Sequence, residues 1–393
     1  MGCNRRATRQ ILQTEKILMT DTLHIQSQSQ PQPPPRRAGT IIYLLAASVA
    51  LMMTGFGIIM PVFARRLGEF GDGVAALGWM AMAFSLSQMI AAPFAGALAD
   101  RYGRRPIVLV SLAAFALTNV GYLLAASTGA FIGVRFVGGL LTAGLFPAAM
   151  AIVADIVPED ERGKWIGMVM GGYAVGMVFG PAIGGVLYDG WGFAAPFVTS
   201  AGLALAALIF AALLVPETLP PRESRQSQPA GNGNQPASRE SVWQALPRPL
   251  AIFATLLFVD FVMVFSFAFI EPQMVFYFYD DLGWSTTQFG VVVGAYGLAM
   301  VVGQTALGQL SDRFGRRPMM LLGILFNFSL FVTMAFFTSF PVYLTIAAVS
   351  GLGVSLFNPA INAYFLDITA AAHRSRVMGI KESALGLGGV LGP

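Results

Sequence analysis

Long apolar stretches alternate with short charged segments along most of the chain. Runs without a charged residue extend over residues 38–64, 74–99, 106–134, 190–216, 282–311 and 318–366. Each run is long enough to cross the hydrocarbon core of a bilayer as a helix, and the last is long enough to cross twice. Because lipid offers no partner to backbone polar groups, and because the runs lack the alternation of barrel strands, the pattern predicts an all-α integral membrane protein.

Composition agrees with a chain that requires a lipid bilayer around it. Of the 393 residues, 55% are hydrophobic and only 11% are charged, and the mean hydropathy is +0.67, which lies outside the range of soluble domains. We place membrane spans at residues 41–62, 76–98, 107–126, 130–154, 165–187, 193–215, 250–279, 286–310, 319–338 and 341–366, with an eleventh that begins near Val377.

The basic residues indicate which ends of the spans face the cytoplasm. If the N-terminus is cytoplasmic, the 24 lysines and arginines fall on cytoplasmic segments, except Arg65 and Arg66, which lie outside, and Arg135, which lies within a span. This asymmetry follows the positive-inside rule. It predicts a multi-pass protein of the plasma (inner) membrane with a cytoplasmic N-terminus, and it explains the basic balance without nucleic-acid binding.

Residues suited to catalysis or metal binding are scarce. Cys3 is the only cysteine, and His24 and His373 both lie outside the predicted spans, so neither a disulfide framework nor a metal site is expected. The sequence has no phosphate-binding loop, zinc-protease motif or nucleophile elbow. We therefore expect a protein that is not an enzyme and that holds no cofactor and no metal.

Two polar segments divide the chain. Residues 1–37 are polar and rich in Gln and Pro, which predicts a disordered cytoplasmic tail. Residues 216–248 form a cytoplasmic linker rich in Pro, Gly, Ser and Gln. The linker separates an N-terminal bundle of six helices, residues 38–215, from a C-terminal bundle, residues 249–393, which holds helices 7 to 10 and part of helix 11.

The two halves are repeats of each other. The segment GALADRYGRRP from Gly96 recurs as GQLSDRFGRRP from Gly308, and later acidic and Gly-Pro positions recur at the same offset of 212 residues. Such a repeat implies gene duplication and two bundles related by an axis along the membrane normal. The first half continues for about 35 residues beyond its Gly-Pro pair, whereas the second ends there at Pro393, so we expect helix 11 to be incomplete and helix 12 to be missing.

The repeated segment resembles the signature loop between helices 2 and 3 of the Major Facilitator Superfamily. In that family a loop aspartate, an arginine four residues on and an acid ending helix 4 form a charge cluster that latches the two bundles and is released during transport. The resemblance assigns this latch to Gly96, Asp100, Arg101, Gly103, Arg104, Arg105 and Asp155, and to Gly308, Asp312, Arg313, Gly315, Arg316, Arg317 and Asp367. The alternative is that the arginines only anchor the loop in the cytoplasm.

The loop glycines have an expected structural use of their own. We expect Gly96 to allow close approach of two helices and Gly103 to allow a tight turn.

Arg135, in the segment RFVGGLLTAG, resembles the helix 4 arginine that is tied to proton coupling in the family. A charge within a span is costly and is by default a functional-site hypothesis. The alternative is a side chain that snorkels toward the outer end of its helix. The repeat partner of Arg135 is Ala347, so the fold itself does not require an arginine at this position.

The segment GYAVGMVFGPAIGGVL, residues 172–187, places small residues four apart on one helix face. Such a face allows close packing on a neighbouring helix, and the proline bends the helix. The fuller pattern resembles the antiporter motif of the drug:proton antiporters, the twelve-helix multidrug and tetracycline type within the superfamily, and implies export rather than uptake. The motif residues are Gly172, Gly176, Gly180, Pro181, Gly184 and Gly185.

Asp260 and Glu271 are the carboxylates inside the seventh predicted span. Eleven residues at 100° each bring both side chains to one face of a helix, about 16 Å apart. Carboxyl groups without partners in a low-dielectric site can exchange protons near neutral pH, so we expect both, with Arg135, to carry the proton coupling. The alternative is a pair of satisfied polar residues at helix contacts, with Pro272 bending the helix out of alignment.

The predicted function is proton-driven export of small hydrophobic compounds by a monomer that works by alternating access. Helix 1 has no acid inside its predicted span, which disfavours tetracycline as the substrate. Two alternatives stay open: a nutrient or metabolite symporter or uniporter of the same fold, and an inactive truncated remnant. Weaker candidates for substrate contact are the polar residues Gln88, Tyr173, Gln304, Asn358 and Asn362.

Overall fold

A computed structural model describes residues 36–158, 161–218, 247–307, 310–369 and 374–393, apart from a few side chains within these ranges. In these ranges the chain forms helices joined by short turns, and no strand occurs. Ten helical segments there are long and apolar enough to cross a membrane. The predicted all-α membrane fold is confirmed. Most of the predicted tail and linker lies outside the described residues.

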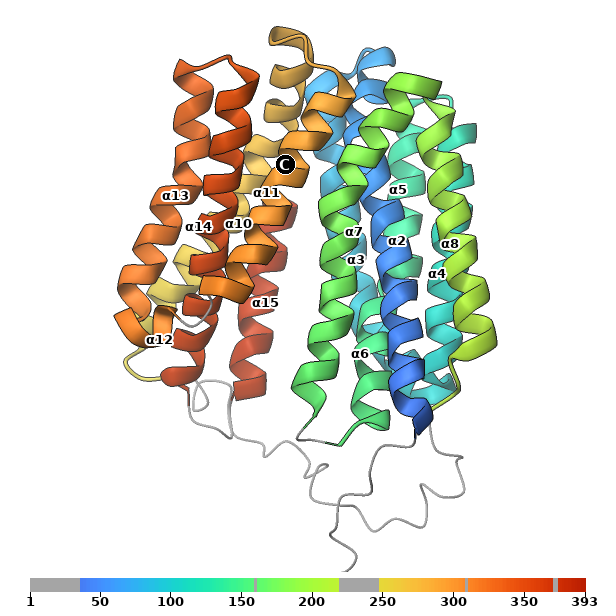
Figure 1. Cartoon of the computed structure of the whole chain (residues 1–393), viewed down its shortest axis with the longest axis vertical. Coiled ribbons are helices and arrows are strands. Elements are labelled where there is room, and N and C mark those ends of the chain that lie inside the picture. The colour runs from blue at the N-terminus through green and yellow to red at the C-terminus, as the bar shows by residue number, and fades with distance from the viewer. Residues whose placement is uncertain (1–35, 159–160, 219–246, 308–309, 370–373) are drawn as a thin grey trace, which may run out of the picture.

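The helices form two groups that stand side by side (Figure 1). The N-terminal group contains α2 (Arg36–Glu69), α3 (Gly73–Tyr102), α4 (Arg104–Leu124), α5 (Thr128–Thr142), α6 (Leu145–Ile156), α7 (Arg162–Trp191) and α8 (Ala194–Leu214). The C-terminal group contains α10 (Leu250–Phe276), the π-helical turn η3 (Tyr277–Asp281), α11 (Thr286–Leu307), α12 (Leu310–Phe314), α13 (Arg316–Phe336), α14 (Phe340–Asp367) and α15 (Arg374–Leu391). We call the end of the molecule where α2 begins and α8 ends the linker end, and the opposite end the distal end.

The predicted spans agree with these helices to within four residues, except that α2 is longer by five residues at its start and seven at its end, and there is one interruption. The fourth span is divided into α5 and α6 by a turn at Ala143 and Gly144. Pro147 follows this turn, and a proline ring in a helix clashes with the carbonyl group four residues earlier, which is that of Ala143. The proline therefore accounts for the position of the break.

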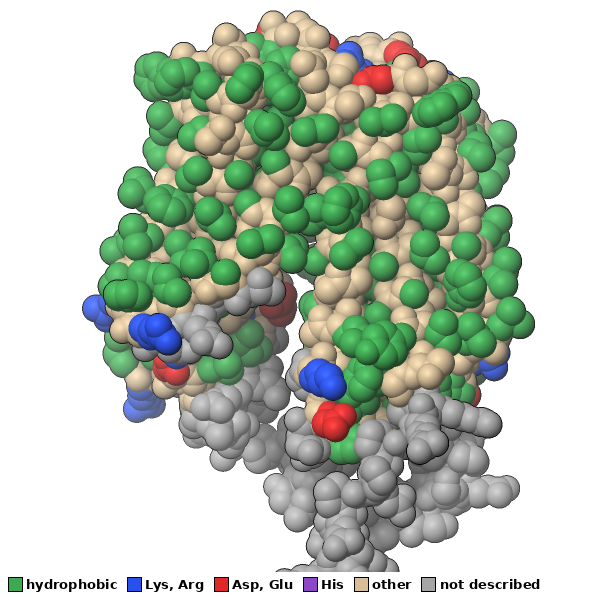
Figure 2. Space-filling view, in the orientation of Figure 1, with side chains coloured by type: hydrophobic (Ala, Val, Ile, Leu, Met, Phe, Trp, Pro, Cys, Tyr) green, Lys and Arg blue, Asp and Glu red, His purple; other side chains and the backbone are tan. Residues whose placement is uncertain are grey.

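The sides of both bundles present apolar side chains to their surroundings. Leu124 and Leu213, for example, are 78% and 75% exposed. Hydrophobic side chains cover the sides of the molecule, whereas the charged side chains in view gather toward its two ends (Figure 2). A soluble monomer rarely exposes so much contiguous apolar surface, whereas a surface in contact with lipid needs it.

Aromatic clusters pack the distal end of each bundle. In the N-terminal bundle the buried rings of Phe63, Phe131 and Phe197 lie with their centres 6.2–6.4 Å apart. In the C-terminal bundle Phe278 stacks on Trp284 with a centre-to-centre distance of 4.6 Å. Such ring pairs add stability beyond the area that they bury, so each bundle is firmly packed at the end where the two bundles meet.

Candidate functional site at the bundle interface

The candidate site lies between the two bundles, which meet along two seams. On one seam α7 packs on α11, and on the other α3 packs on α15 and α10. On the first seam, Gly185 and Gly290 lie so close to the opposite helix that a Cβ atom at either position would overlap its backbone. The charged residues predicted inside the spans lie beside these seams.

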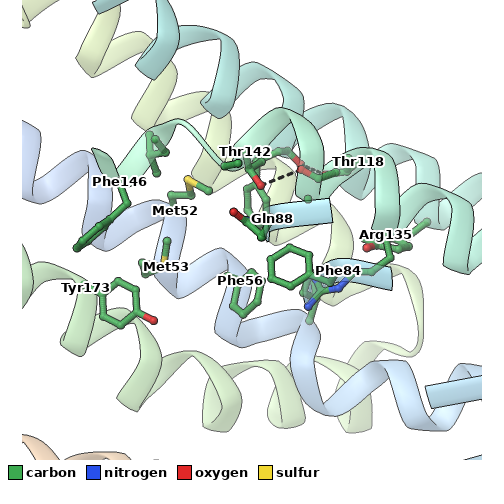
Figure 3. A pocket seen from close by; sticks show the side chains of 17 residues that line it. Met52, Met53, Phe56, Phe84, Gln88, Thr118, Arg135, Thr142, Phe146 and Tyr173 are labelled. Carbon is green, nitrogen blue, oxygen red and sulfur yellow. Dashed lines mark hydrogen bonds between the residues drawn. The ribbon is translucent and has the colours of Figure 1, made fainter. Parts of the chain in front are cut away.

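Arg135 projects from α5 into a cavity of about 220 Å³ in the N-terminal bundle (Figure 3). Its guanidinium carbon lies 3.9 Å from the ring centre of Phe84, and 5.0 Å and 5.1 Å from those of Phe56 and Phe63. The electron-rich faces of these rings stabilise a cation that has left water. The side chain is therefore held inside the bundle, a geometry that does not fit snorkelling to the membrane surface.

Glu271 lines a second cavity, of about 280 Å³, between the bundles. It is the one charged residue in the lining of this cavity. The N-terminal bundle contributes Met60 and Met177, and the C-terminal bundle contributes most of the remaining apolar and aromatic wall, including Phe267, Met274, Phe289, Tyr296 and Met300. The arrangement places one carboxylate in apolar surroundings between the bundles.

Asp260 does not share the site of Glu271. It is 5% exposed and faces α15, where the Lys381 Nζ atom lies 3.5 Å from the Asp260 Oδ2 atom. The prediction of two carboxylates without partners on one helix face is therefore wrong for Asp260. Lys381, which was counted with the cytoplasmic residues, is 5% exposed at the contact of α15 with α10.

The distal end is closed by polar contacts between the bundles, which the sequence analysis did not predict. Asp189, near the end of α7, accepts hydrogen bonds from the backbone N–H groups of Thr286 (3.2 Å) and Thr287 (2.7 Å) and from the Thr287 hydroxyl (2.6 Å). The Tyr279 hydroxyl donates to the Pro61 carbonyl at 2.7 Å. The second bundle thus supplies partners for groups that would otherwise face water.

At the linker end, each copy of the loop motif forms an ion pair inside its own bundle. Arg104, at the start of α4, pairs with Asp155 of α6. In the second copy the Arg316 Nε atom lies 3.0 Å from the Asp367 Oδ2 atom. The structure thus brings together the predicted arginine and helix-end acid of each set. Of the other predicted latch members, Gly308 and the side chains of Asp100 and Asp312 lie outside what the structure describes.

Glycines make the turns of both motif copies possible. Gly103 and Gly315 have φ angles of +113° and +91°, in the region that side chains disfavour, and each ends one helix and starts the next. Gly96 does not allow close helix approach, because a Cβ atom there would meet no atom within 4 Å. That expectation is wrong for the conformation observed here, in which α3 has no tight neighbour at this position.

Glu217, the first charged residue of the linker, belongs to the same cluster. Its carboxylate accepts hydrogen bonds from the backbone N–H groups of Arg104 (3.0 Å) and Arg105 (3.3 Å). The next residue, Thr218, donates its hydroxyl to Asp155 at 2.9 Å. Glu217 could not be predicted from the sequence, because a carboxylate in a polar linker is ordinary in composition. Its position between Pro216 and a threonine carries no further signal.

The glycines of the antiporter-type motif lie where α7 is packed between two other helices. Gly185 faces α11 of the C-terminal bundle, and Pro181 lies inside α7. The other motif glycines lie so close to α2 that a Cβ atom would overlap its atoms: Gly172, Gly176, Gly180 and Gly184. The motif glycines therefore allow close packing on two sides of α7, against α2 on one side and against α11 on the other.

Two of the predicted substrate contacts lie in a cavity. Gln88 from α3 and Tyr173 from α7 both line the Arg135 cavity (Figure 3). Gln304 and Asn358 are exposed. Asn362 is partly buried, and its side-chain oxygen is buried without a hydrogen-bond partner among the described residues. The structure thus groups Gln88 and Tyr173 with Arg135 and leaves the other three apart.

Two related helical bundles with an apolar outer surface, a cavity between them that holds Glu271, and a cavity in the N-terminal bundle that holds Arg135 define a multi-pass membrane transporter. The family model of the Major Facilitator Superfamily matches residues 45–279 and 256–393. The chain belongs to this superfamily, as the sequence analysis predicted.

Similar proteins extend over most of the chain. Tetracycline resistance protein, class G, of Vibrio anguillarum is 31% identical over 369 residues, which cover 91% of this chain and 89% of that protein. Multidrug resistance protein 2 of Bacillus subtilis is 26% identical over 359 residues, covering 90% and 87%. A solved structure of an inward-facing, unoccupied bacterial homologue of the human lysosomal transporter Spinster has a TM-score of 0.75 at 16% identity, covering 91% of this chain and 81% of that one.

Proposed function

We propose that the protein exports small hydrophobic compounds in exchange for protons, by alternating access of a site between the two bundles. In this proposal the linker end faces the cytoplasm, as the distribution of basic residues indicates, and the protein works as a monomer in the plasma (inner) membrane. The names of its relatives, which are resistance proteins for several drugs or for tetracycline, support export of drugs.

The observation that carries the proposal is the carboxylate of Glu271 in an apolar cavity between the two bundles, with Arg135 in a separate cavity of the N-terminal bundle. An ionised carboxylate in apolar surroundings is costly, and a proton removes that cost. A hydrophobic substrate that fills the cavity competes with the water that would receive or deliver the proton. Proton and substrate therefore exclude each other at one site, and exchange transport requires this exclusion.

The conformation suits a site that is open to the cytoplasm. At the distal end the Asp189 contacts and a hydrogen bond of 2.5 Å from Arg65 to the Trp284 carbonyl hold the bundles together. Toward the linker end, the space-filling view shows the molecule hollowed between its two halves (Figure 2). Rocking of one bundle against the other would open the distal end and close the linker end.

Efflux of ethidium from energised cells tests the proposal. Cells that express the protein are expected to lose dye faster than cells that do not, and collapse of the proton gradient should abolish the difference. Glu271→Gln should also abolish it, because an amide cannot carry the proton. Asp281→Asn is the matched control, since this exposed carboxylate lies at the distal end of the same helical segment, outside the cavity.

Two results would contradict the proposal. If no hydrophobic dye is exported although the protein is present in the membrane at a normal level, nutrient or metabolite transport becomes the better explanation. If export persists without a gradient and in Glu271→Gln, the protein is not a proton exchanger that uses this carboxylate.

A further inference from the structure

Lys381 lies between two carboxylates at the contact of α15 with α10. Its Nζ atom is 3.5 Å from Asp260 Oδ2 and 3.4 Å from Glu382 Oε1. Lys381 and Asp260 are both 5% exposed, whereas the Glu382 side chain is 66% exposed. The Asp260 Oδ2 atom has no hydrogen-bond partner among the described residues. One cation is thus shared by a buried carboxylate and an accessible one.

Among the side chains that the structure describes, the charges that act on this trio are its own members. The charged groups that face Asp260 are Lys381 and Glu382, both from α15. The other helices packed on α10 carry their charges near their ends: α2 has none in its middle, α3 has none before Asp100, and α14 has none before Asp367.

The exposed member of the trio faces the seam between the bundles. Glu382 lines a groove of about 490 Å³ between α15 and α3, together with Phe84, Gln88 and Met89. Phe84 and Gln88 also line the Arg135 cavity, so the groove adjoins the candidate transport site. A proton on Glu382 therefore lies at an open groove beside the candidate site, whereas a proton on Asp260 is enclosed.

One lysine can fully neutralise only one of the two carboxylates. When both are ionised, the lysine favours Asp260, because a buried charge without a partner costs far more than an accessible one. When Asp260 is protonated, the lysine is released to Glu382. The trio then has no net charge, and it keeps zero net charge if the proton moves from Asp260 to Glu382.

We propose that Lys381 is a positioning residue for proton release, which turns from Glu382 to Asp260 as a proton passes from Asp260 to Glu382. In this step the O–H bond of Asp260 breaks, an O–H bond forms on Glu382, and the lysine keeps its charge. Glu382 then gives the proton to water in the groove. The inference rests on the proposed proton exchange and adds a second ionisable site to it, separate from Glu271.

The test measures dye transport by the purified protein in lipid vesicles, first driven by a proton gradient and then as dye exchange without a gradient. Glu382→Gln is expected to lower gradient-driven dye transport by about tenfold or more and to leave dye exchange without a gradient unchanged, since exchange needs no proton release. Lys381→Met alone leaves Asp260 buried without a partner and is expected to destabilise the fold. The double variant Asp260→Asn/Lys381→Met is expected to restore the fold but not gradient-driven transport.

Lys381→Arg keeps the charge and is expected to retain gradient-driven transport with a shifted pH profile, which a merely structural role would not produce. Asp280→Asn, an exposed carboxylate at the distal end of the same segment, is the matched control for loss of one negative charge. If the wild type is driven by the gradient, and Glu382→Gln and the double variant match its pH profile and rate, the trio is a structural ion pair and this inference is overturned. If the wild type itself ignores the gradient, the proposed function fails, and the inference fails with it.

Discussion

Asp189 of α7 caps the first turn of α11 across the bundle interface, with its Oδ2 atom 2.7 Å from the Thr287 backbone nitrogen and 2.6 Å from the Thr287 hydroxyl. A cap of this kind usually comes from the residue that precedes the helix in sequence. Here it comes from the other bundle, so it can exist only while the distal end is closed. It also places a negative charge at the positive end of the α11 dipole.

We therefore predict that Asp189→Ala favours opening of the distal end. Loss of a capping carboxylate costs up to about 2 kcal/mol, so Asp189→Ala is expected to shift the equilibrium by about that amount, or about thirtyfold. Distances between spin labels on the distal ends of α7 and α11 would report the shift. Asp281→Asn removes an exposed carboxylate at the same end, and an identical effect from that variant would argue against the cap.

Close packing of α7 on α2 leads to a second prediction. A Cβ atom at Gly180 would lie 2.7 Å from the Gly57 Cα atom and 2.8 Å from the Thr54 carbonyl oxygen. Gly180→Ala is expected to separate the two helices and to lower the free energy of unfolding by about 1–3 kcal/mol. Thermal melting in detergent measures the change.

The same helix offers the matched control for this prediction. A Cβ atom at Gly171 would meet no atom within 4 Å, so Gly171→Ala is expected to be neutral or slightly stabilising, as alanine is in a helix. Equal melting temperatures for the two variants would contradict a role of the motif glycines in packing α7 on α2.

The sequence predicted the helices well because lipid imposes their length and apolar character, and both are visible in a single segment. It also located the close α7 packing, because a row of small residues four apart has few other uses in a membrane helix. It failed where partners come from different helices. Lys381 follows the polar segment RSR and resembles a loop residue, and its partner Asp260 lies 121 residues earlier. Asp189 binds backbone N–H groups, which leave no mark in a sequence.

The contact of the linker with α4 gives a third prediction. Glu217 accepts hydrogen bonds from the first two backbone N–H groups of α4, those of Arg104 and Arg105. Glu217→Ala is expected to lower the free energy of unfolding by about 1 kcal/mol, the usual cost of losing a helix cap. Glu217→Asp keeps the charge and tests whether the longer side chain is needed to reach α4. A Glu217→Ala variant that melts like the wild type would show that the linker does not cap this helix.

The surroundings of Arg135 distinguish a role of its charge from a role of its shape. The guanidinium carbon lies 3.9 Å from the Phe84 ring centre, and the ammonium group of a lysine is a point charge that stacks less well on a ring. Arg135→Lys keeps the charge and is expected to lose about 1–2 kcal/mol of ring contact, which lowers gradient-driven efflux without abolishing it. Arg135→Gln loses both the charge and the ring contact, and it is expected to abolish gradient-driven efflux. Initial efflux rates at equal expression should follow the order Arg, Lys, Gln. If Arg135→Lys exports dye as fast as the wild type, the charge alone is enough. If Arg135→Gln exports dye as fast as the wild type, this residue has no part in proton coupling.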